Sequence, residues 1–559
     1  MSGLFGFSCD RQDADDRATI SAVHSMAASL KHRAHFHECP LFKNSEIIAG
    51  QVQTPFFADK NPPGASGGLH AWIDGEINDP ITNDPAGFLL AQYSLSRSFD
   101  FCKNVNGVFS AVIYDGAEKK IHCITDRFGL HYLYWSCAKG RFCWASELKA
   151  FIGLPWFNPH IAQEKIQSFL LNGFFSGDET WFDEVSLVPW GSVISFDGAT
   201  KRVTSNRYWQ IREYDGQSTT GSPRQYRDRL AALFERSVSR CCRSGERICV
   251  GLSGGLDSRA ILAAIPRSIT GLSAYSFGMN GSPDIAIAGA AARVRGVPHR
   301  IEPIDGSNWF QPRIEGVWLS DGMLDMMHMH GIEALPTMGE LCDVELNGFL
   351  GDAVIGASYG TDNGKMFDRF FNRGRRMIRA TLLLCKPFIH VRMPFTDYEL
   401  VDYIVAVPPV LRKNSRLYNA MLVSRYPAYF AKIPWQKAGI PISYPHSFVH
   451  AGVKINKIFN RLGVRGLLLS TMRSFFDYNG WIRSEPARTG IERILANPKS
   501  LYKEFIDPSK VRSCFREHLS GKDRSSELCR YVTIELWLQQ ALNKSMRPDL
   551  NTGEVKDDC

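Results

Sequence analysis

The residues with the clearest chemical pattern in this chain are two adjacent glycines framed by serines and an aspartate. The run SGGLDS at 253–258 follows an apolar stretch, 248–252, and leads into an alanine-rich stretch, 260–264. This order predicts a strand, a glycine loop and a helix. Paired glycines let the backbone approach an anion closely, and the free N–H groups at the start of a helix point toward it. The loop is therefore predicted to bind phosphate.

This loop differs from the common phosphate loop of nucleoside triphosphatases. The pattern GxxxxGK[ST] occurs nowhere in the sequence, so no lysine is placed there for transfer of the γ-phosphate. SGGLDS instead resembles the PP-loop of ATP pyrophosphatases, which binds pyrophosphate while AMP is transferred to a substrate oxygen. A chance match in an ordinary Ser/Gly turn is the alternative.

Two aspartates are predicted to hold a magnesium ion. A predicted strand at 344–347 runs into GFLGD at 348–352, which puts Asp352 at the carboxyl end of a strand, where such sheets bind their ligands. Asp257 lies in the phosphate loop itself. Mg²⁺ is commonly held by one or two carboxylates together with nucleotide phosphates. We expect Asp257 and Asp352 to be those ligands, and helix capping is the alternative for each.

Alternating strands and helices are predicted around the loop. Strands at 272–278 and 299–304, with an alanine-rich helix at 284–294 between them, indicate a doubly wound parallel sheet. After about residue 366 the chain is predicted to be largely helical, with arginine-rich faces. For these arginines a solvated face is favoured over a functional one. They are Arg369, Arg373, Arg375, Arg376 and Arg379.

The first 210 residues have a different pattern. Short strands, many aromatic residues, turns at 74–75 and 115–116 and little helix beyond 19–32 predict an α+β layered domain. A segment rich in Ser, Thr, Gly and Asp then predicts a linker. The expected organisation is a first domain at 1–212, a linker at 213–225 and a second domain at 226–559.

Composition is that of a globular enzyme with more than one domain. The chain has 559 residues, of which 44% are hydrophobic and 22% charged. It has no apolar stretch of about 18 residues that could span a membrane, and its acidic start argues against a signal peptide. The 14 cysteines are scattered without a CxxC pair, so we expect reduced thiols and a cytoplasmic location. A net charge of +8 is modest for this length; nucleic acid is not favoured as a partner, and a homodimer is left open.

Taken in order, the motifs resemble the asparagine synthetase family over nearly the full length. The glutaminase-type half is carried by MSGLFGF at 1–7, LKHRAHF at 30–36, DGEINDP at 74–80, NGVFSAVIYD at 106–115, TDRFGLHYLYW at 125–135 and ASELKAF at 145–151. The synthetase half is carried by SGGLDSR at 253–259, the Gly351-Asp352 pair, MPFTD at 393–397 and IPWQKAGIP at 433–441.

The resemblance implies a fold, cofactors and site residues. It implies an N-terminal Ntn-hydrolase-like αββα sandwich, followed by a PP-loop domain with a doubly wound parallel sheet and a helical C-terminal extension. ATP and Mg²⁺ are the implied cofactors. Lys437 is assigned to the phosphates of ATP and the leaving pyrophosphate, a task suited to a flexible ammonium group, although a plain surface lysine is the alternative. The residues assigned to ATP are Leu252, Ser253, Gly254, Gly255, Leu256, Asp257, Ser258, Phe277 and Gly351.

Departures from the family pattern concern the glutamine site. Glutamine-hydrolysing members carry a cysteine after the initiator methionine, whereas this chain has Ser2, whose hydroxyl is a much weaker nucleophile. Arg33, Asp74, Gly75 and Glu76 stand where the family binds glutamine, and Asp74 replaces an asparagine by a negative charge. We expect an inactive scaffold that has lost its glutamine.

A further departure concerns proton transfer. Three residues before Asp352, asparagine synthetases carry a glutamate and β-lactam synthetases a tyrosine that helps to deprotonate the attacking amine. This chain has Phe349, which cannot transfer a proton. The general base is therefore another group, or the nucleophile is already neutral, and Phe349 either shapes the substrate site or only packs.

Together these features predict an amide-bond-forming ligase. A substrate carboxylate would attack the α-phosphorus of ATP to give an acyl-adenylate and pyrophosphate, and an amine or ammonia would then displace AMP. A free amino acid, a peptide and an acidic sugar all remain open as the carboxylate. The alternatives are a glutamine-dependent synthetase that uses Ser2, a cyclase of the β-lactam or lasso-peptide type, a PP-loop protein that modifies tRNA, and a non-catalytic nucleotide-binding scaffold.

Overall fold

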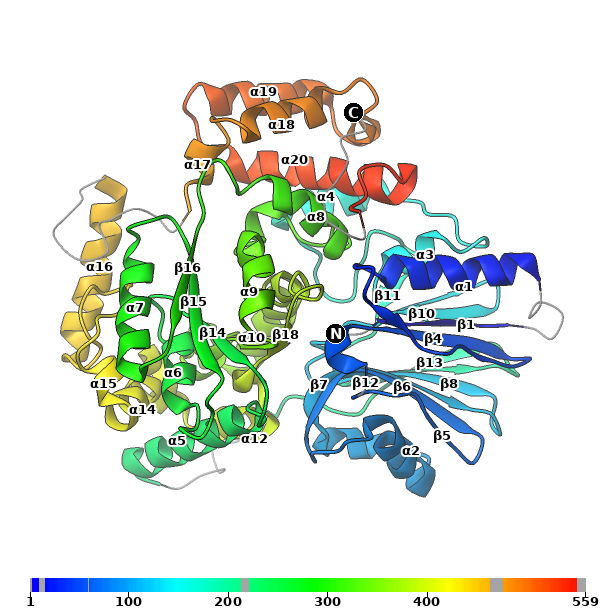
Figure 1. The fold of residues 1–559 in the computed structure, drawn as a ribbon, viewed down its shortest axis with the longest axis horizontal. Coiled ribbons are helices and arrows are strands. Elements are labelled where there is room, and N and C mark those ends of the chain that lie inside the picture. The colour runs from blue at the N-terminus through cyan, green and yellow to red at the C-terminus, as the bar shows by residue number, and fades with distance from the viewer. Residues whose placement is uncertain (1–2, 10–15, 59, 213–220, 463–475, 550–559) are drawn as a thin grey trace.

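Two domains of different architecture lie side by side in the computed structural model (Figure 1), which describes residues 3–9, 16–58, 60–212, 221–462 and 476–549. The N-terminal domain is an antiparallel sandwich and the C-terminal domain contains a parallel sheet. Ser2 and most of the predicted linker lie outside the described residues. The predicted domain boundaries stay a prediction.

Two antiparallel sheets form the sandwich. One has the strand order β11-β9-β10-β1-β4-β2, with β3 paired to β4, and the other has the order β13-β12-β8-β7-β6-β5. Helix α1 (Arg17–Leu30) covers the first sheet and α2 (Pro85–Ser96) covers the second (Figure 1). The predicted αββα layering is therefore present. The strands are β1 (Gly3–Ser8), β2 (His37–Glu38), β3 (Phe42–Lys43), β4 (Ile47–Gln53), β5 (Gly64–Ser66), β6 (Leu69–Asp79), β7 (Asn106–Asp115), β8 (Lys120–Thr125), β9 (Tyr134–Ala138), β10 (Arg141–Ala145), β11 (Ser186–Leu187), β12 (Ser192–Asp197) and β13 (Arg202–Arg207).

Two expectations for this domain were wrong. Asp74 and Gly75 do not form a turn but lie inside β6, where Gly75 has a φ of +109° and a Cβ would stand 2.2 Å from the carbonyl oxygen of Val108. The glycine is needed here for close approach of two strands rather than for reversal of the chain. The domain also holds more helix than expected, since α2 and α4 (Gln163–Asn172) follow the first helix. The turn after Asp115 is confirmed, because β7 ends there and β8 begins at Lys120.

A five-stranded parallel sheet in the order β16-β15-β14-β17-β18 forms the centre of the second domain. Helices α6 (Asp257–Ala264) and α7 (Pro283–Arg295) lie on one face, and α9 (Leu335–Leu341) lies on the other (Figure 1). The doubly wound sheet was predicted, and the strand expected at 272–278 has those bounds. The strands are β14 (Ile248–Gly251), β15 (Leu272–Gly278), β16 (His299–Pro303), β17 (Val344–Leu346) and β18 (His390–Arg392).

One cysteine pair departs from the expected reduced state. Cys249 in β14 and Cys342, which precedes β17, form a disulfide with their Cα atoms 5.8 Å apart. The sequence did not predict this bond because the two residues are 93 positions apart and meet only when β14 and β17 pair.

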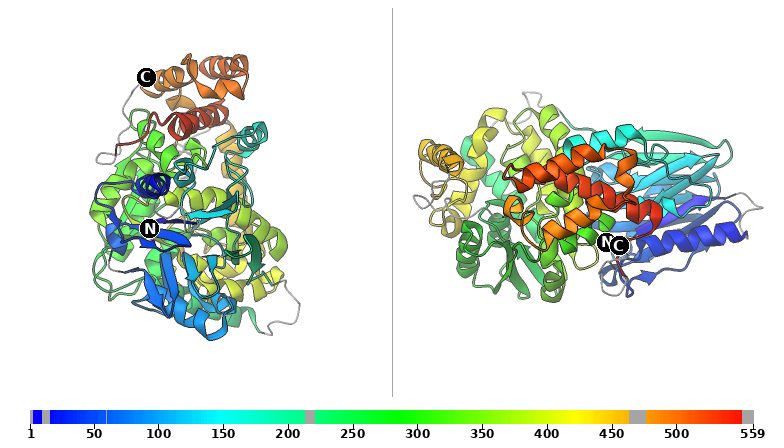
Figure 2. Two further views of the ribbon diagram at one scale, coloured as in Figure 1. Left: turned by 90° about the vertical axis from the view of Figure 1, so that its right-hand side faces the viewer. Right: turned by 90° about the horizontal axis from the view of Figure 1, so that it is seen from above.

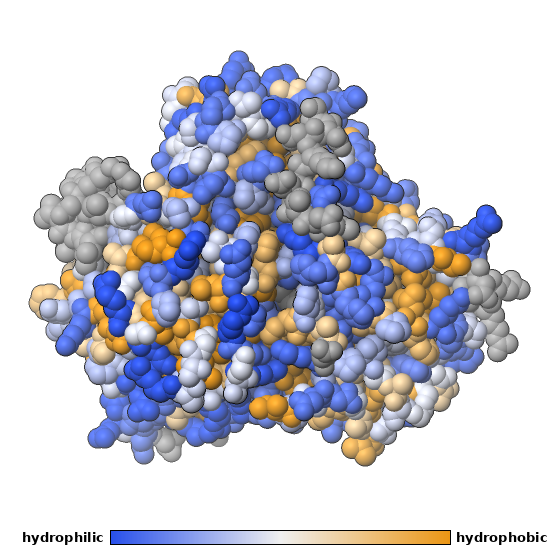
Figure 3. All heavy atoms as spheres, viewed as in Figure 1, coloured by the Kyte–Doolittle hydropathy of each residue, from blue (hydrophilic) through white to orange (hydrophobic). Residues whose placement is uncertain are grey.

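Helices at the C-terminal end form a layer that contacts both domains. Helix α20 (Ser525–Leu538) packs against α8 (Gln311–Leu319) of the second domain and against α4 of the first. In the view from above, the orange and red helices cross the junction of the domains (Figure 2). Hydrophilic side chains dominate this layer on the face drawn in Figure 3, and hydrophobic side chains gather lower down over both domains. Across the described residues, none of the helices has the length and apolar character needed to cross a membrane.

Three of the predicted surface arginines are buried between the domains, so the expectation of a solvated face was wrong for them. Arg375 donates to the carbonyl oxygens of Gly129 and Val188, each at 2.8 Å, and pairs with Asp178 at 3.1 Å. Arg376 and Arg379 likewise donate to carbonyl oxygens of the sandwich. The second domain is thus attached through guanidinium groups that satisfy backbone carbonyls of the first.

Replacing Arg375 by methionine should destabilise the protein strongly. Two buried carbonyl groups lose their donors, and each such loss costs about 1–3 kcal/mol. The neighbouring Arg373 is exposed, so Arg373→Met should change the free energy of unfolding by less than about 0.5 kcal/mol. Urea denaturation followed by circular dichroism measures both variants. Equal stability of the two variants would refute the structural role of Arg375.

Candidate functional site

The glycine loop connects β14 to α6, as the sequence predicted. It holds its shape through short-range hydrogen bonds: the Gly255 N–H donates to Ser253 Oγ at 3.1 Å, and the Ser253 N–H donates to Ser258 Oγ at 3.3 Å. Leu252 and Leu256, at the two ends of the loop, are buried. The loop lies at the carboxyl end of β14, which is the edge of a parallel sheet where ligands bind.

Asp257, Asp352 and Lys437 meet beside this loop. The Asp352 N–H donates to Asp257 Oδ2 at 2.8 Å, and Lys437 Nζ lies 3.4 Å from Asp352 Oδ2. Gly351 makes the approach possible, because a Cβ on it would stand 2.5 Å from Asp257 Cγ. Leu350 has a φ of +64°, a left-handed conformation that costs a non-glycine residue about 1–2 kcal/mol. The loop is thus bent so that Asp352 faces Asp257.

The two carboxylates suit a divalent cation. Burial, and then the charge of Asp352, raise the pKa of Asp257 to about 7, and a bound cation would relieve both effects. Tyr418 donates its hydroxyl to Asp257 Oδ1 at 2.8 Å and holds this carboxylate in place. Among the described residues no group of three or more His, Cys, Asp or Glu could hold a metal by itself. A pair of carboxylates therefore fits Mg²⁺ that shares its ligands with phosphates.

Two aromatic residues of interest lie near the same edge. Phe277, which the resemblance assigns to ATP, is near the end of β15, and its ring leaves no room for a side chain at Gly331, where a Cβ would stand 2.5 Å from Phe277 Cζ. Phe349 is 3% exposed, and its N–H donates to Asn347 Oδ1 at 3.0 Å. Its burial agrees with the packing interpretation.

Two residues of the predicted glutamine pocket, Arg33 and Glu76, are bonded to the other domain. Arg33 Nη1 lies 2.6 Å from Glu315 Oε1. Arg392 holds Glu76 in a two-pronged contact, with Nε at 2.7 Å from Oε2 and Nη2 at 2.9 Å from Oε1, and His390 Nε2 is 2.8 Å from Oε2. These partners occupy two of the charged groups that the resemblance assigns to glutamine.

Asp74 faces a very small cavity. Its Oδ2 accepts a hydrogen bond from Ser146 Oγ at 3.1 Å. The cavity beside it has a volume of about 20 Å³, which is room for about one water molecule. Its wall includes the buried carboxylates of Glu147 and Asp321. Lys149 Nζ forms ion pairs with both, 2.5 Å from Glu147 Oε2 and 2.8 Å from Asp321 Oδ1.

Three residues near the glycine loop were not predicted as site residues. Tyr418 holds Asp257, while Asp284 and Gln436 bond to each other and to the loop. A sequence signal existed for Asp284, which opens the helix after β15 at the ligand edge of the sheet, and for Gln436, which precedes Lys437. Tyr418 carried no such signal.

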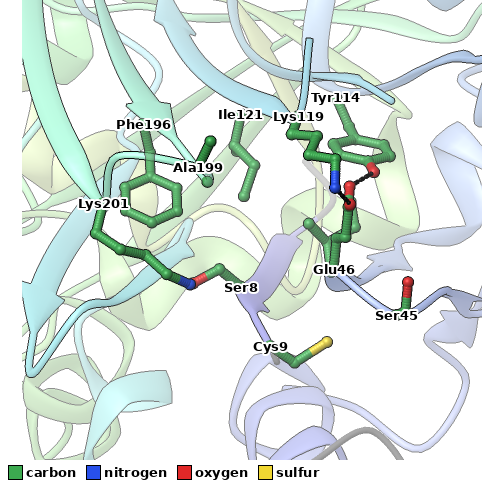
Figure 4. A pocket seen from close by; sticks show the side chains of 12 residues that line it. Ser8, Cys9, Ser45, Glu46, Tyr114, Lys119, Ile121, Phe196, Ala199 and Lys201 are labelled. Carbon is green, nitrogen blue, oxygen red and sulfur yellow. Dashed lines mark hydrogen bonds and ion pairs between the residues drawn. The ribbon is translucent and has the colours of Figure 1, made fainter. Parts of the chain in front are cut away.

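A cavity of about 210 Å³ is lined by residues of both sheets of the sandwich (Figure 4). Its lining residues, among them Cys9, Tyr114 and Lys201, all belong to the N-terminal domain. Lys119 Nζ and the Tyr114 hydroxyl contact Glu46 at 2.8 and 2.5 Å. Since no residue of the glycine loop contributes, this cavity has no part in the candidate site.

Both domains match known family profiles. Residues 86–209 match the glutamine amidotransferase domain, and residues 229–359 match asparagine synthase. A probable glutamine-hydrolyzing asparagine synthetase of Acanthamoeba polyphaga mimivirus is 23% identical over 342 residues, which are 58% of this chain and 60% of that protein. A putative glutamine-hydrolyzing asparagine synthetase of Mycobacterium tuberculosis is 24% identical over 224 residues, which are 39% of this chain and 34% of that protein.

These relatives are distant, and less than two thirds of the length of either is matched. A solved structure, the allosteric regulatory enzyme of purine biosynthesis, is 12% identical in sequence, and the match covers 54% of this chain and 80% of that chain. Its TM-score of 0.27 is too low to support an inference. The chain is thus similar to a glutamine amidotransferase domain in its first part and to asparagine synthase in its second.

Replacing Glu76 by glutamine should destabilise the domain interface. Burial would raise the pKa of Glu76, but Arg392 and His390 hold it well below 4.5. The carboxylate therefore contributes stability that is present above pH 4.5 and lost as the pH falls below it. At neutral pH we expect a loss of about 3 kcal/mol, typical of a broken buried pair.

The pH dependence gives this prediction its control. The difference in the free energy of unfolding between wild type and Glu76→Gln should shrink below pH 4.5. The control is Glu38, which forms an exposed ion pair with Lys31. Glu38→Gln should lower the free energy of unfolding by less than about 1 kcal/mol at any pH. Urea denaturation at several pH values measures both. A pH-independent difference for Glu76→Gln would contradict the assignment.

Proposed function

We propose that this asparagine synthetase-like chain is an ATP-dependent, amide-forming ligase that takes its nitrogen from an amine or ammonia in solution. A substrate carboxylate attacks the α-phosphorus of ATP and releases pyrophosphate, and the amine then displaces AMP from the acyl-adenylate. The observation that supports the first step, the reaction of the carboxylate with ATP, is the close approach of Asp257, Asp352 and Lys437 at the glycine loop.

The chain's own residues support this chemistry by binding and orienting charge. The serines and glycines of 253–258 line the place for pyrophosphate at the start of α6. Asp257 and Asp352 would hold Mg²⁺, which neutralises charge on the phosphates when it is bound. Lys437 is exposed and carries a mobile ammonium group next to them, so it can follow the leaving pyrophosphate.

The proposed nitrogen source follows from the first domain. Arg33 and Glu76 are held by residues of the second domain, and the cavity at Asp74 has room for about one water molecule. These contacts support a domain that is kept for its packing rather than for hydrolysis of glutamine. Phe349 cannot accept a proton, which favours an amine that arrives neutral.

The nucleotide products test the ligase assignment. With ATP and an extract of host-cell metabolites, we expect AMP and pyrophosphate as products, separated by chromatography. Asp352→Asn and Lys437→Ala should each lower AMP formation by about 100-fold or more, since each removes a group that stabilises phosphate charge. Lys432→Ala, at an exposed lysine nearby, should leave the rate unchanged. ADP as the main product would refute the assignment.

Glutamate release tests the nitrogen source. Neither wild type nor Ser2→Ala should release glutamate from glutamine, because an unactivated hydroxyl is a weak nucleophile. Amide synthesis should instead require an ammonium salt or a substrate amine and should be equal in the two proteins. Release by wild type that disappears in Ser2→Ala would establish the glutamine-dependent alternative.

A further inference from the structure

We propose that Asp284 and Gln436 are positioning residues that fix Lys437 against the glycine loop. The proposal rests on the proposed function, in which Lys437 contacts the phosphates of ATP. Neither residue belongs to the predicted set of ATP contacts. Both act through the backbone that carries Lys437.

One buried carboxylate joins three segments of the domain. Asp284 lies in the first turn of α7, directly after β15, and is 6% exposed. Its Oδ1 accepts the N–H of Gly254 at 2.9 Å, and its Oδ2 accepts Nε2 of Gln436 at 2.6 Å. The carboxylate therefore ties α7, the glycine loop and the segment of Lys437 together.

Gly254 also contacts the backbone of Gln436. The Gln436 N–H donates to the Gly254 carbonyl oxygen at 3.3 Å. A Cβ on Gly254 would stand 2.7 Å from Gln436 Cβ and 3.0 Å from Asp284 Oδ1. Gly254 thus lies between the two residues with no space for a side chain. Gln436 can contact Gly254 in this way only when the segment that carries Gln436 and Lys437 lies directly on the glycine loop.

A buried arginine supports the same arrangement. Arg259 is fully buried, and it donates through Nε to the Gly255 carbonyl oxygen at 2.6 Å and through Nη1 to the Tyr429 carbonyl oxygen at 3.4 Å. The chain from Tyr429 to Gln436 is therefore held to the loop at both of its ends. The backbone of Lys437 follows directly.

Fixing this backbone matters because the lysine side chain is not fixed by burial. Its side chain is 57% exposed, and an exposed lysine loses rotamer freedom when it is ordered. With the backbone held, the ammonium group starts 3.4 Å from Asp352 Oδ2, next to the loop that is proposed to hold the phosphates. The clamp thus lowers the entropy that is lost when Lys437 engages pyrophosphate.

An exchange of hydrogen-bond polarity tests the clamp. Gln436→Glu places two carboxylates face to face and should weaken binding of MgATP at least tenfold in isothermal titration calorimetry. Asp284→Asn keeps an acceptor for Gly254 and should weaken binding less than about threefold, because the Gln436 amide can turn over and accept from the new N–H. The double variant, in which asparagine donates to glutamate, should bind within about threefold of wild type. Asp305→Asn, on an exposed loop, is the control and should bind like wild type.

A second comparison separates positioning from general damage. In the Lys437→Ala background, Gln436→Glu should cause less than about a twofold further loss of MgATP affinity, because its effect passes through the lysine. A full additive loss, or a double variant as weak as Gln436→Glu alone, would overturn the proposal while leaving the ligase assignment intact. Failure of the wild type to bind MgATP would overturn both.

Discussion

Charge buried between the two domains is the constraint on which the rest of the structure depends. Three guanidinium groups of the second domain donate hydrogen bonds to backbone carbonyls of the first domain. Arg392 forms an ion pair with Glu76 across the same interface. Leaving one partner of such a pair buried alone costs about 3–5 kcal/mol. The domains therefore cannot slide past each other without breaking several contacts at once, and β18, which carries Arg392, keeps a fixed position beside β17.

That fixed sheet allows the candidate site to hold like charges close together. Asp257 and Asp352 are joined through a backbone N–H and face the same space, and burial together with the charge of Asp352 raises the pKa of Asp257. A cation and a polyphosphate would relieve this repulsion while meeting groups already in place. Such preorganisation avoids reorganising the site when charge develops in the transition state. The glycines of the loop and Gly351 are needed for the close approach rather than for flexibility.

Sequence patterns predicted the parts of this molecule that depend on neighbours in the chain. The strand, loop and helix at 248–264 and the strand at 272–278 follow from local hydrophobic runs and glycines, and Asp352 follows from its place at a strand end. The buried arginines and Tyr418 could not be predicted, because their burial depends on partners more than 100 residues away. Asp74-Gly75 was misread because a pair typical of turns also serves inside a long strand. The roles of the site residues stay predictions.

The pairing of Arg33 with Glu315 and of Glu76 with Arg392 has an evolutionary consequence. If an ancestor of this chain hydrolysed glutamine, its descendants cannot regain that activity by one substitution. A cysteine at position 2 would supply a nucleophile but would leave the arginine and the glutamate bound to the other domain. Releasing them would first break contacts that now stabilise the fold, so each step back would pass through a less stable protein. Under that condition the interface itself would keep the activity from returning.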